Sequence, residues 1–245
     1  MTRVLITRPA DEADALAKRV EAMGFVPVIE PLISICALPG AKVDAFDIQA
    51  VVFTSANGVR ALATASGGES VSRTLPVFAV GTATAAAARA AGFQDVHEGQ
   101  GTVEDLARVI AGNLPAQRGP ILHVSGSVVA RDLAPLLAAS RHTVRRAVLY
   151  ESVPAAALRS GTRRQIEAGA VGAALFFSPR TARTFVTLIE ASRLQGAMRS
   201  IVSFGLSAAV SDALTSLPFA RVVTAARPTT DALLESLLGA GLTNA

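Results

Sequence analysis

Short apolar runs alternate along the chain with helical patterns, and turns that contain a hydroxyl residue or a glycine lie between them. The clearest case is the apolar run at residues 50–54, which is followed by Ser55 and then by a helical pattern. The same order recurs 123 positions later, where a run at residues 173–177 precedes Ser178 and Pro179. Strand and helix patterns that alternate in this way predict parallel sheets covered by helices, because the crossovers between parallel strands are right-handed.

The repeat covers further segments and divides the chain into two domains. Residues 77–81 match residues 201–205, whereas the unit at residues 121–137 finds its counterpart at the N-terminus. The most economical arrangement is a discontinuous domain with a second domain inserted into it. We therefore predict an α/β fold with two small parallel-sheet domains, helices on both faces and a two-stranded linker. The predicted bounds are 1–34 with 154–245 for the discontinuous domain, 39–147 for the inserted domain, and 35–38 and 148–153 for the linkers.

Proline positions refine two of the predicted elements. Pro27 lies inside the strand predicted at residues 26–29, and it cannot donate a hydrogen bond to a neighbouring strand. This strand is therefore expected at the edge of its sheet. Pro154 ends an extended segment, and the pattern after it predicts a helix over residues 155–168.

The composition fits a globular chain without membrane segments. The sequence is 51% hydrophobic and 17% charged, which is sufficient for two cores of ordinary size. No apolar run approaches the roughly 20 residues that span a bilayer, and the apolar run at the start is too short for a signal peptide. We predict a soluble, cytoplasmic protein with no membrane partner.

The charge distribution argues against nucleic-acid binding. The net charge is +4, and 21 of the 23 basic residues are arginine, but no basic run is longer than a pair. A nucleic-acid surface would concentrate these charges and intersperse them with aromatic residues, yet the chain has no Trp and one Tyr. A small acidic ligand is the better interpretation.

The cysteine and the three histidines do not indicate a metal site. Cys36 stands alone, and its apolar neighbours Ile33 and Ile35 favour a buried, unreactive thiol. His97, His123 and His142 lack the spacing of metal ligands and are read as ordinary histidines. We therefore expect no metal.

The candidate binding residues lie where predicted strands give way to helices. In a parallel sheet these junctions meet at one edge, where ligands bind, and helix N-termini there favour anions. Helix capping alone is the alternative explanation for each residue. Motifs for a nucleophile elbow, a phosphate-binding loop or a dinucleotide fold are absent, which disfavours a cofactor enzyme. The candidates are Arg8, Thr54, Ser55, Gly81, Thr102, Ser125, Ser178, Gly205 and Thr229.

Tyr150 differs from these residues because it is the single tyrosine and lies at a strand end in a predicted linker. Its phenol could act as a hydrogen-bond donor or weak general acid toward a bound ligand. On spacing alone, a tyrosine that packs at a domain boundary is an equally good explanation.

The order and spacing of several short motifs resemble those of the uroporphyrinogen-III synthase family across nearly the whole chain. That resemblance implies a lyase of porphyrin and heme biosynthesis, with two α/β domains, a two-stranded linker and no cofactor or metal. Its substrate would be hydroxymethylbilane, a linear tetrapyrrole with eight carboxylates. The motifs are Thr7-Arg8-Pro9, Phe53-Thr54-Ser55-Ala56-Asn57-Gly58-Val59, Ala79-Val80-Gly81-Thr82, Tyr150 with Pro154, Phe177-Ser178-Pro179, Phe204-Gly205 and Pro228-Thr229.

The resemblance also implies a mechanism and residue roles. The substrate hydroxyl leaves to give an azafulvene cation, a spiro intermediate forms, and ring closure with the terminal pyrrole inverted yields uroporphyrinogen III. Tyr150 would assist departure of the hydroxyl. Carboxylates would be bound, largely through backbone N–H groups, at Thr54, Ser55, Ser178, Gly205 and Thr229. Phe177 stands where the first copy has Thr54, so the two junctions cannot bind in the same way.

A second reading is a two-domain binding protein for a small polycarboxylate, which would bind tightly without turnover. Either reading needs no partner subunit, so we predict a monomer.

Overall fold

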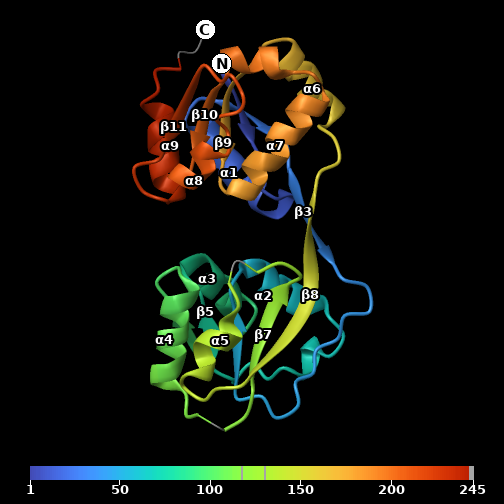
Figure 1. The fold of residues 1–245 in the computed structure, drawn as a ribbon, viewed down its shortest axis with the longest axis vertical. Coiled ribbons are helices and arrows are strands. Elements are labelled where there is room, and N and C mark those ends of the chain that lie inside the picture. The colour runs from blue at the N-terminus through green and yellow to red at the C-terminus, as the bar shows by residue number, and fades with distance from the viewer. Residues whose placement is uncertain (117, 130, 243–245) are drawn as a thin grey trace. The chain divides into compact units, whose positions relative to one another are not determined.

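A computed structural model describes residues 1–116, 118–129 and 131–242. The chain forms two compact units (Figure 1). The discontinuous unit comprises Met1–Ser34 and the chain from Val153 onward, and the inserted unit comprises Ile35–Ser152.

The discontinuous unit is built on a five-stranded parallel sheet with the order β11-β10-β9-β1-β2. β2 is an edge strand, which confirms the position predicted from Pro27. The strands are β1 (Arg3–Ile6), β2 (Val26–Ile29), β9 (Val171–Phe176), β10 (Val202–Gly205) and β11 (Arg221–Thr224). The helices are α1 (Ala10–Ala22), α6 (Ser160–Glu167), α7 (Pro179–Ala191), α8 (Ala208–Asp212) and α9 (Thr230–Leu238), and a 3₁₀ turn spans Gln195–Ser200.

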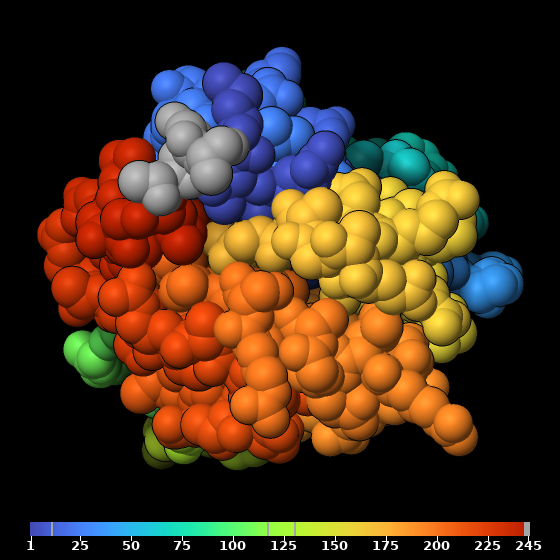
Figure 2. Space-filling model, turned by 90° about the horizontal axis from the view of Figure 1, so that it is seen from above, coloured from blue at the N-terminus to red at the C-terminus, as the bar shows by residue number. Residues whose placement is uncertain are grey.

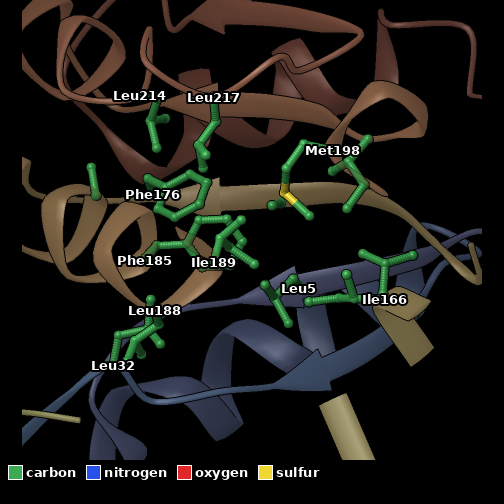
Figure 3. Close-up of a cluster of buried hydrophobic side chains, with 14 of the residues drawn as sticks. Leu5, Leu32, Ile166, Phe176, Phe185, Leu188, Ile189, Met198, Leu214 and Leu217 are labelled. Carbon is green, nitrogen blue, oxygen red and sulfur yellow. The ribbon is translucent and has the colours of Figure 1, made fainter. Parts of the chain in front are cut away.

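Strand alternation divides the interior of this unit between the two faces of its sheet. Val4 and Ile6 point to one face, where they pack with residues of α1 and α9. Leu5 points to the other face and joins a cluster in which α7 supplies the most residues of any helix, including Phe185 (Figure 3). Because both faces are covered, β1 is apolar without alternation at each position after Arg3.

The two ends of the described chain meet in the discontinuous unit. Figure 2 shows the N-terminal segment, in blue, beside the C-terminal segment, in red. Arg19 Nη2 of α1 lies 2.6 Å from Asp231 Oδ1 of α9. Exposed ion pairs add little stability, so the buried apolar side chains of α1 and α9 mainly hold these helices to the sheet.

The inserted unit is built on a six-stranded sheet with the order β3-β8-β7-β4-β5-β6. The strands are β3 (Ile33–Ala37), β4 (Ala50–Phe53), β5 (Val77–Ala79), β6 (Val96–Glu98), β7 (Ile121–Gly126) and β8 (Val144–Pro154). The helices are α2 (Ala56–Thr64), α3 (Thr82–Ala90), α4 (Val103–Asn113) and α5 (Leu133–Ala138), and a 3₁₀ turn spans Gly68–Ser70. Val51 and Phe53 pack under α2 and α3, whereas Ala50 and Val52 pack under α4 and α5.

β3 and β8 are hydrogen-bonded neighbours and continue from one unit into the other. The Leu38 N–H donates to Leu149 O at 2.9 Å, and the Ala155 N–H donates to Leu32 O at 2.9 Å. The two pairings fit strands that run in opposite directions. The predicted linker 148–153 lies inside β8, and most of the linker 35–38 lies inside β3.

Two expectations from the sequence are wrong. Residues 155–159 are not helical, and α6 begins at Ser160. Buried Glu30 accepts the Arg159 N–H at 2.9 Å and a bond from Thr162 Oγ1, so a side chain distant in sequence fixes the start of the helix. Cys36 is exposed rather than buried, because β3 is an edge strand and residues 36 and 37 face solvent.

Gly58 tests how closely α2 packs on the sheet. A Cβ at this position would lie 2.9 Å from Val124 O, so α2 must move to accept a side chain. We expect Gly58→Ala to lower the free energy of unfolding of the inserted unit by about 1–3 kcal/mol, as overpacking does. Gly112→Ala is the matched control, since nothing lies within 4 Å of that Cβ. The control should stabilise α4 by about 0.5–1 kcal/mol. Equal effects of the two variants in urea unfolding would contradict this packing.

Candidate functional site

A change of register between β7 and β8 sets the position of Tyr150. Ser125 is paired with Val148, but Gly126 is paired with Tyr150, so Leu149 is left without a partner in the register. Such a bulge turns the following side chain away from simple alternation. Leu149 and Tyr150 are accordingly both buried, although they are consecutive.

The ring of Tyr150 lies directly against the backbone of Gly126. A Cβ at position 126 would be 2.7 Å from Tyr150 Cε2 and 3.0 Å from Cζ. These distances are shorter than van der Waals contact, so any side chain at this position would displace the ring. Glycine is therefore required here for close approach.

The Tyr150 phenol is suited to remain protonated at neutral pH. Burial raises its pKa above the ordinary value of 10.0, because the charged phenolate is poorly solvated. Hydrogen bonds with the Ser55 side chain and the Gly126 backbone, and the positive charge of Arg60, act in the opposite direction. If the phenol gives up its proton, these three groups stabilise the phenolate that remains.

Arg146 holds the carboxyl end of β7 and the residue that follows it. Its Nε donates to Ser125 Oγ at 2.8 Å, and its Nη2 donates to Gly126 O at 2.7 Å and to Ser127 O at 3.2 Å. The Ser127 N–H in turn donates to Tyr150 O at 2.8 Å. One guanidinium therefore fixes three consecutive residues beside the tyrosine.

His123 is a buried group whose contacts the sequence did not indicate. Its Nε2 lies 3.2 Å from Thr54 Oγ1, and its Nδ1 has no hydrogen-bond partner among the described residues. Burial and then the charge of Arg146 lower its pKa to about 4, and Asp132 acts in the opposite direction. His123 is therefore neutral at physiological pH and can fix the Thr54 hydroxyl. The available signal was a polar residue inside the apolar strand β7.

Other predicted residues of the inserted unit start helices at the carboxyl ends of strands. Ser55 accepts the Asn57 N–H at 3.2 Å at the start of α2, and Thr102 accepts the Asp105 N–H at 3.1 Å at the start of α4. Gly81 precedes α3 and offers no side chain. The capping explanation therefore holds for Ser55 and Thr102, and it does not exclude binding through nearby backbone groups.

The discontinuous unit has its own set of such residues. Ser178 accepts the Thr181 N–H at 3.1 Å, Thr229 accepts the Ala232 N–H at 3.3 Å, and both residues cap helices. Gly205 ends β10, and a Cβ there would lie 2.5 Å from Ser211 Oγ. The Arg8 guanidinium stacks on the Phe177 ring, 4.2 Å from its centroid, and its Nε lies 3.5 Å from Glu12 Oε2. Phe177 thus orients a cation, whereas its counterpart Thr54 contacts His123.

Comparison with family models decides how these two units are classified. The model described as uroporphyrinogen-III synthase HemD matches residues 14–235, which is most of the chain. The chain belongs to the uroporphyrinogen-III synthase family. Members of this family are cyclising lyases of tetrapyrrole biosynthesis, and the resemblance seen in the sequence is confirmed. The assignment favours the synthase reading over the polycarboxylate-binding protein.

Solved structures support the fold of a uroporphyrinogen-III synthase. The crystal structure of uroporphyrinogen-III synthetase from Helicobacter pylori is 17% identical, with a TM-score of 0.66 over 98% of this chain and 100% of that chain. A mutant uroporphyrinogen III synthase from the extremely thermophilic bacterium Thermus thermophilus is 20% identical, with a TM-score of 0.55 over 98% of each chain. None of the curated protein sequences compared with the chain matches it significantly. The predicted α/β fold with two units is confirmed.

The structure of this uroporphyrinogen-III synthase family member brings part of the predicted set together. Ser55 and Ser125 lie at the carboxyl ends of β4 and β7, and Thr54 lies beside β7 through its bond to His123. Tyr150 lies next to them but inside β8, which continues to Pro154, so the prediction that it ends a strand is wrong. Within residues 1–116, 118–129 and 131–242, no group of three or more His, Cys, Asp or Glu residues could hold a metal ion. No helix in these ranges is long and apolar enough to cross a membrane.

The phenol of Tyr150 can be titrated directly, because the chain has one Tyr and no Trp. We expect the absorbance step near 295 nm to have its midpoint above pH 10, since burial disfavours the phenolate. Tyr150→Phe is the control and should show no step. A midpoint at or below 10 in folded protein would contradict the buried placement of the ring.

His123 should make the stability of the inserted unit depend on pH. Its folded pKa of about 4 lies below the ordinary value of 6.5, so its contribution is complete above pH 6.5 and is lost as the pH falls toward 4. Between pH 7 and pH 5 this amounts to about 2 kcal/mol, which His123→Gln should remove from the urea-unfolding profile. His97→Gln is the control and should keep the wild-type loss. The same loss in His123→Gln would show that His123 is not the group that titrates.

Proposed function

We propose that the chain converts hydroxymethylbilane to uroporphyrinogen III, with Tyr150 as the group that protonates the departing hydroxyl. The observation that carries the proposal is the buried Tyr150 phenol, which is seated on Gly126 and has the Ser55 side chain and the charge of Arg60 beside it. A protonated phenol beside the carboxyl ends of the parallel strands β4 and β7 is placed as an acid for a bound ligand. Membership of the family supplies the reaction.

The first step breaks the bond between the hydroxyl oxygen and the methylene carbon. The phenol proton moves to this oxygen, water leaves, and the electron-rich pyrrole becomes an azafulvene cation. The Tyr150 phenolate that remains is stabilised by the Ser55 side chain, the Gly126 backbone and the charge of Arg60, which all favour the ionised form.

Ring closure needs positioning more than further acid or base catalysis. The far pyrrole attacks the cation through its substituted carbon and forms the spiro intermediate, which fragments and closes again with the terminal ring inverted. The proton released as the last pyrrole regains aromaticity returns to Tyr150, so the enzyme is restored. The balanced change is loss of one water per substrate, and holding the chain in one geometry directs the closure.

Carboxylate binding is proposed at the junctions where helices begin. The N-termini of α2, α3 and α4 present backbone N–H groups and a positive dipole end near Ser55, Gly81 and Thr102, which suits carboxylates. Thr54 and Ser125 supply hydroxyls beside them. The corresponding residues of the discontinuous unit, which stay predicted substrate contacts, are Arg8, Ser178, Gly205 and Thr229.

We further propose that the enzyme works as a monomer in the cytoplasm and needs no cofactor. The reaction as written is internally balanced and consumes no oxidant, reductant or group donor. Light scattering after size-exclusion chromatography would test the monomer against the chain mass of 25.1 kDa.

The isomer of the product tests the proposed function. Purified protein is incubated with freshly prepared hydroxymethylbilane, the product is oxidised, and the porphyrin isomers are separated by chromatography. We expect predominantly the type III isomer, formed faster than in a sample without protein. Only the type I isomer, at the rate of the sample without protein, would overturn the proposal.

A further inference from the structure

Arg146 directs its described hydrogen bonds to one short segment. All three bonds go to residues 125–127, at 2.7–3.2 Å, and two of the three acceptors are backbone carbonyl oxygens. No carboxylate in the described ranges forms an ion pair with it. A guanidinium whose planar donors meet several acceptors at once holds them in a fixed arrangement, which a point charge cannot do.

The segment that Arg146 holds is also the one that supports Tyr150. The phenol ring occupies the space that a Cβ of residue 126 would need, and the Ser127 N–H donates to the Tyr150 carbonyl at 2.8 Å. The register shift falls between Ser125 and Gly126, so the ladder of β7 and β8 is interrupted at this point. The Arg146 side chain bridges the interruption on both sides, through Ser125 Oγ and Gly126 O.

Arg145, the neighbour of Arg146 on β8, does not bond to the described residues 125–127. Its Nη1 donates to Phe46 O at 2.6 Å and to Asp44 O at 3.2 Å. It also lies 3.1 Å from the Asp44 carboxylate. The two arginines carry the same charge on the same strand, but Arg145 holds the loop before β4.

We infer that Arg146 is a positioning residue that locks the Ser125–Gly126–Ser127 segment beneath Tyr150 and so fixes the direction of its phenol. The inference rests on the proposed function of Tyr150 as the proton donor. Arg146 itself need not touch the substrate. A proton donor that is misdirected by a fraction of an ångström transfers its proton more slowly, although the substrate still binds.

The test compares Arg146→Met with Arg145→Met by turnover and by tyrosine fluorescence. In Arg146→Met we expect kcat to fall about tenfold with KM within about twofold, since transition-state positioning and not ground-state binding is lost. Acrylamide should quench the fluorescence of Tyr150 more strongly, because the ring loosens. Arg145→Met should match the wild type in all three quantities.

Two further variants keep the test sharp if Arg146→Met folds poorly. Arg146→Lys keeps the charge but reaches fewer acceptors, so its kcat and its quenching should fall between those of the wild type and Arg146→Met. Gly126→Ala, which displaces the ring directly, should reproduce the change in quenching.

Unchanged kcat and quenching in Arg146→Met would overturn the inference. A rise in KM alone would also overturn it and would make Arg146 a substrate contact. The quenching experiment needs no turnover, so it remains decisive for Arg146 even if Tyr150→Phe proved fully active and the proposed role of Tyr150 failed.

Discussion

The contact between the Tyr150 ring and the Gly126 backbone is the constraint on which the candidate site depends. A Cβ at residue 126 would lie only 2.7 Å from the ring. The ring can occupy its position because glycine has no Cβ. The bulge at the same position brings Tyr150 into register with Gly126. Close packing excludes water from the ring, and this desolvation raises the pKa of the phenol above its ordinary value. Backbone geometry and acidity are therefore linked at a single residue pair.

The two units use one architecture for different chemistry. In each, parallel strands are covered by helices on both faces, and helices begin at the carboxyl ends of these strands with Ser or Thr caps. The edge strand β3 of the inserted unit is the exception, since it runs opposite to β8. The inserted unit adds buried titratable groups, Tyr150 and His123, at this edge. At the corresponding junction the discontinuous unit has Phe177 under the Arg8 guanidinium. A candidate acid is thus found in the inserted unit alone among the two junctions compared. This agrees with a reaction that needs one acid and otherwise depends on binding and positioning a polyanionic substrate.

Much of the fold could be predicted from the sequence because it depends on local patterns. Three such patterns depend only on residues close together in the sequence. They are the fully apolar strand β4, the helix caps Ser55 and Ser178, and the proline in the edge strand β2. The false prediction of a helix from residue 155 shows the limit, since Glu30, more than 100 positions away, fixes where α6 starts. Cys36 shows another limit, because apolar neighbours do not bury a residue on an edge strand.

The candidate site was predictable in its residue types but not in its arrangement. The presence of a single tyrosine pointed to Tyr150, although the strand end predicted there is wrong because β8 continues to Pro154. Strand-to-helix junctions pointed to Ser55 and Ser125. The register shift, the ring on Gly126 and the bonds of Arg146 depend on pairing between β7 and β8, which leaves no periodic signal in either strand. The same reason explains why the sequence did not distinguish His123 from the other histidines. Its Nδ1 is buried without a hydrogen-bond partner among the described residues only because of how the unit folds.

The rate of type III product formation by Tyr150→Phe, measured against the wild type at saturating substrate, tests the central claim most directly. Phenylalanine preserves the ring on Gly126 and removes only the hydroxyl. The account predicts a rate lower by about a hundredfold, as for loss of a general acid, with the type III isomer still the main product. A wild-type rate in this variant would show that the Tyr150 hydroxyl takes no part in the reaction.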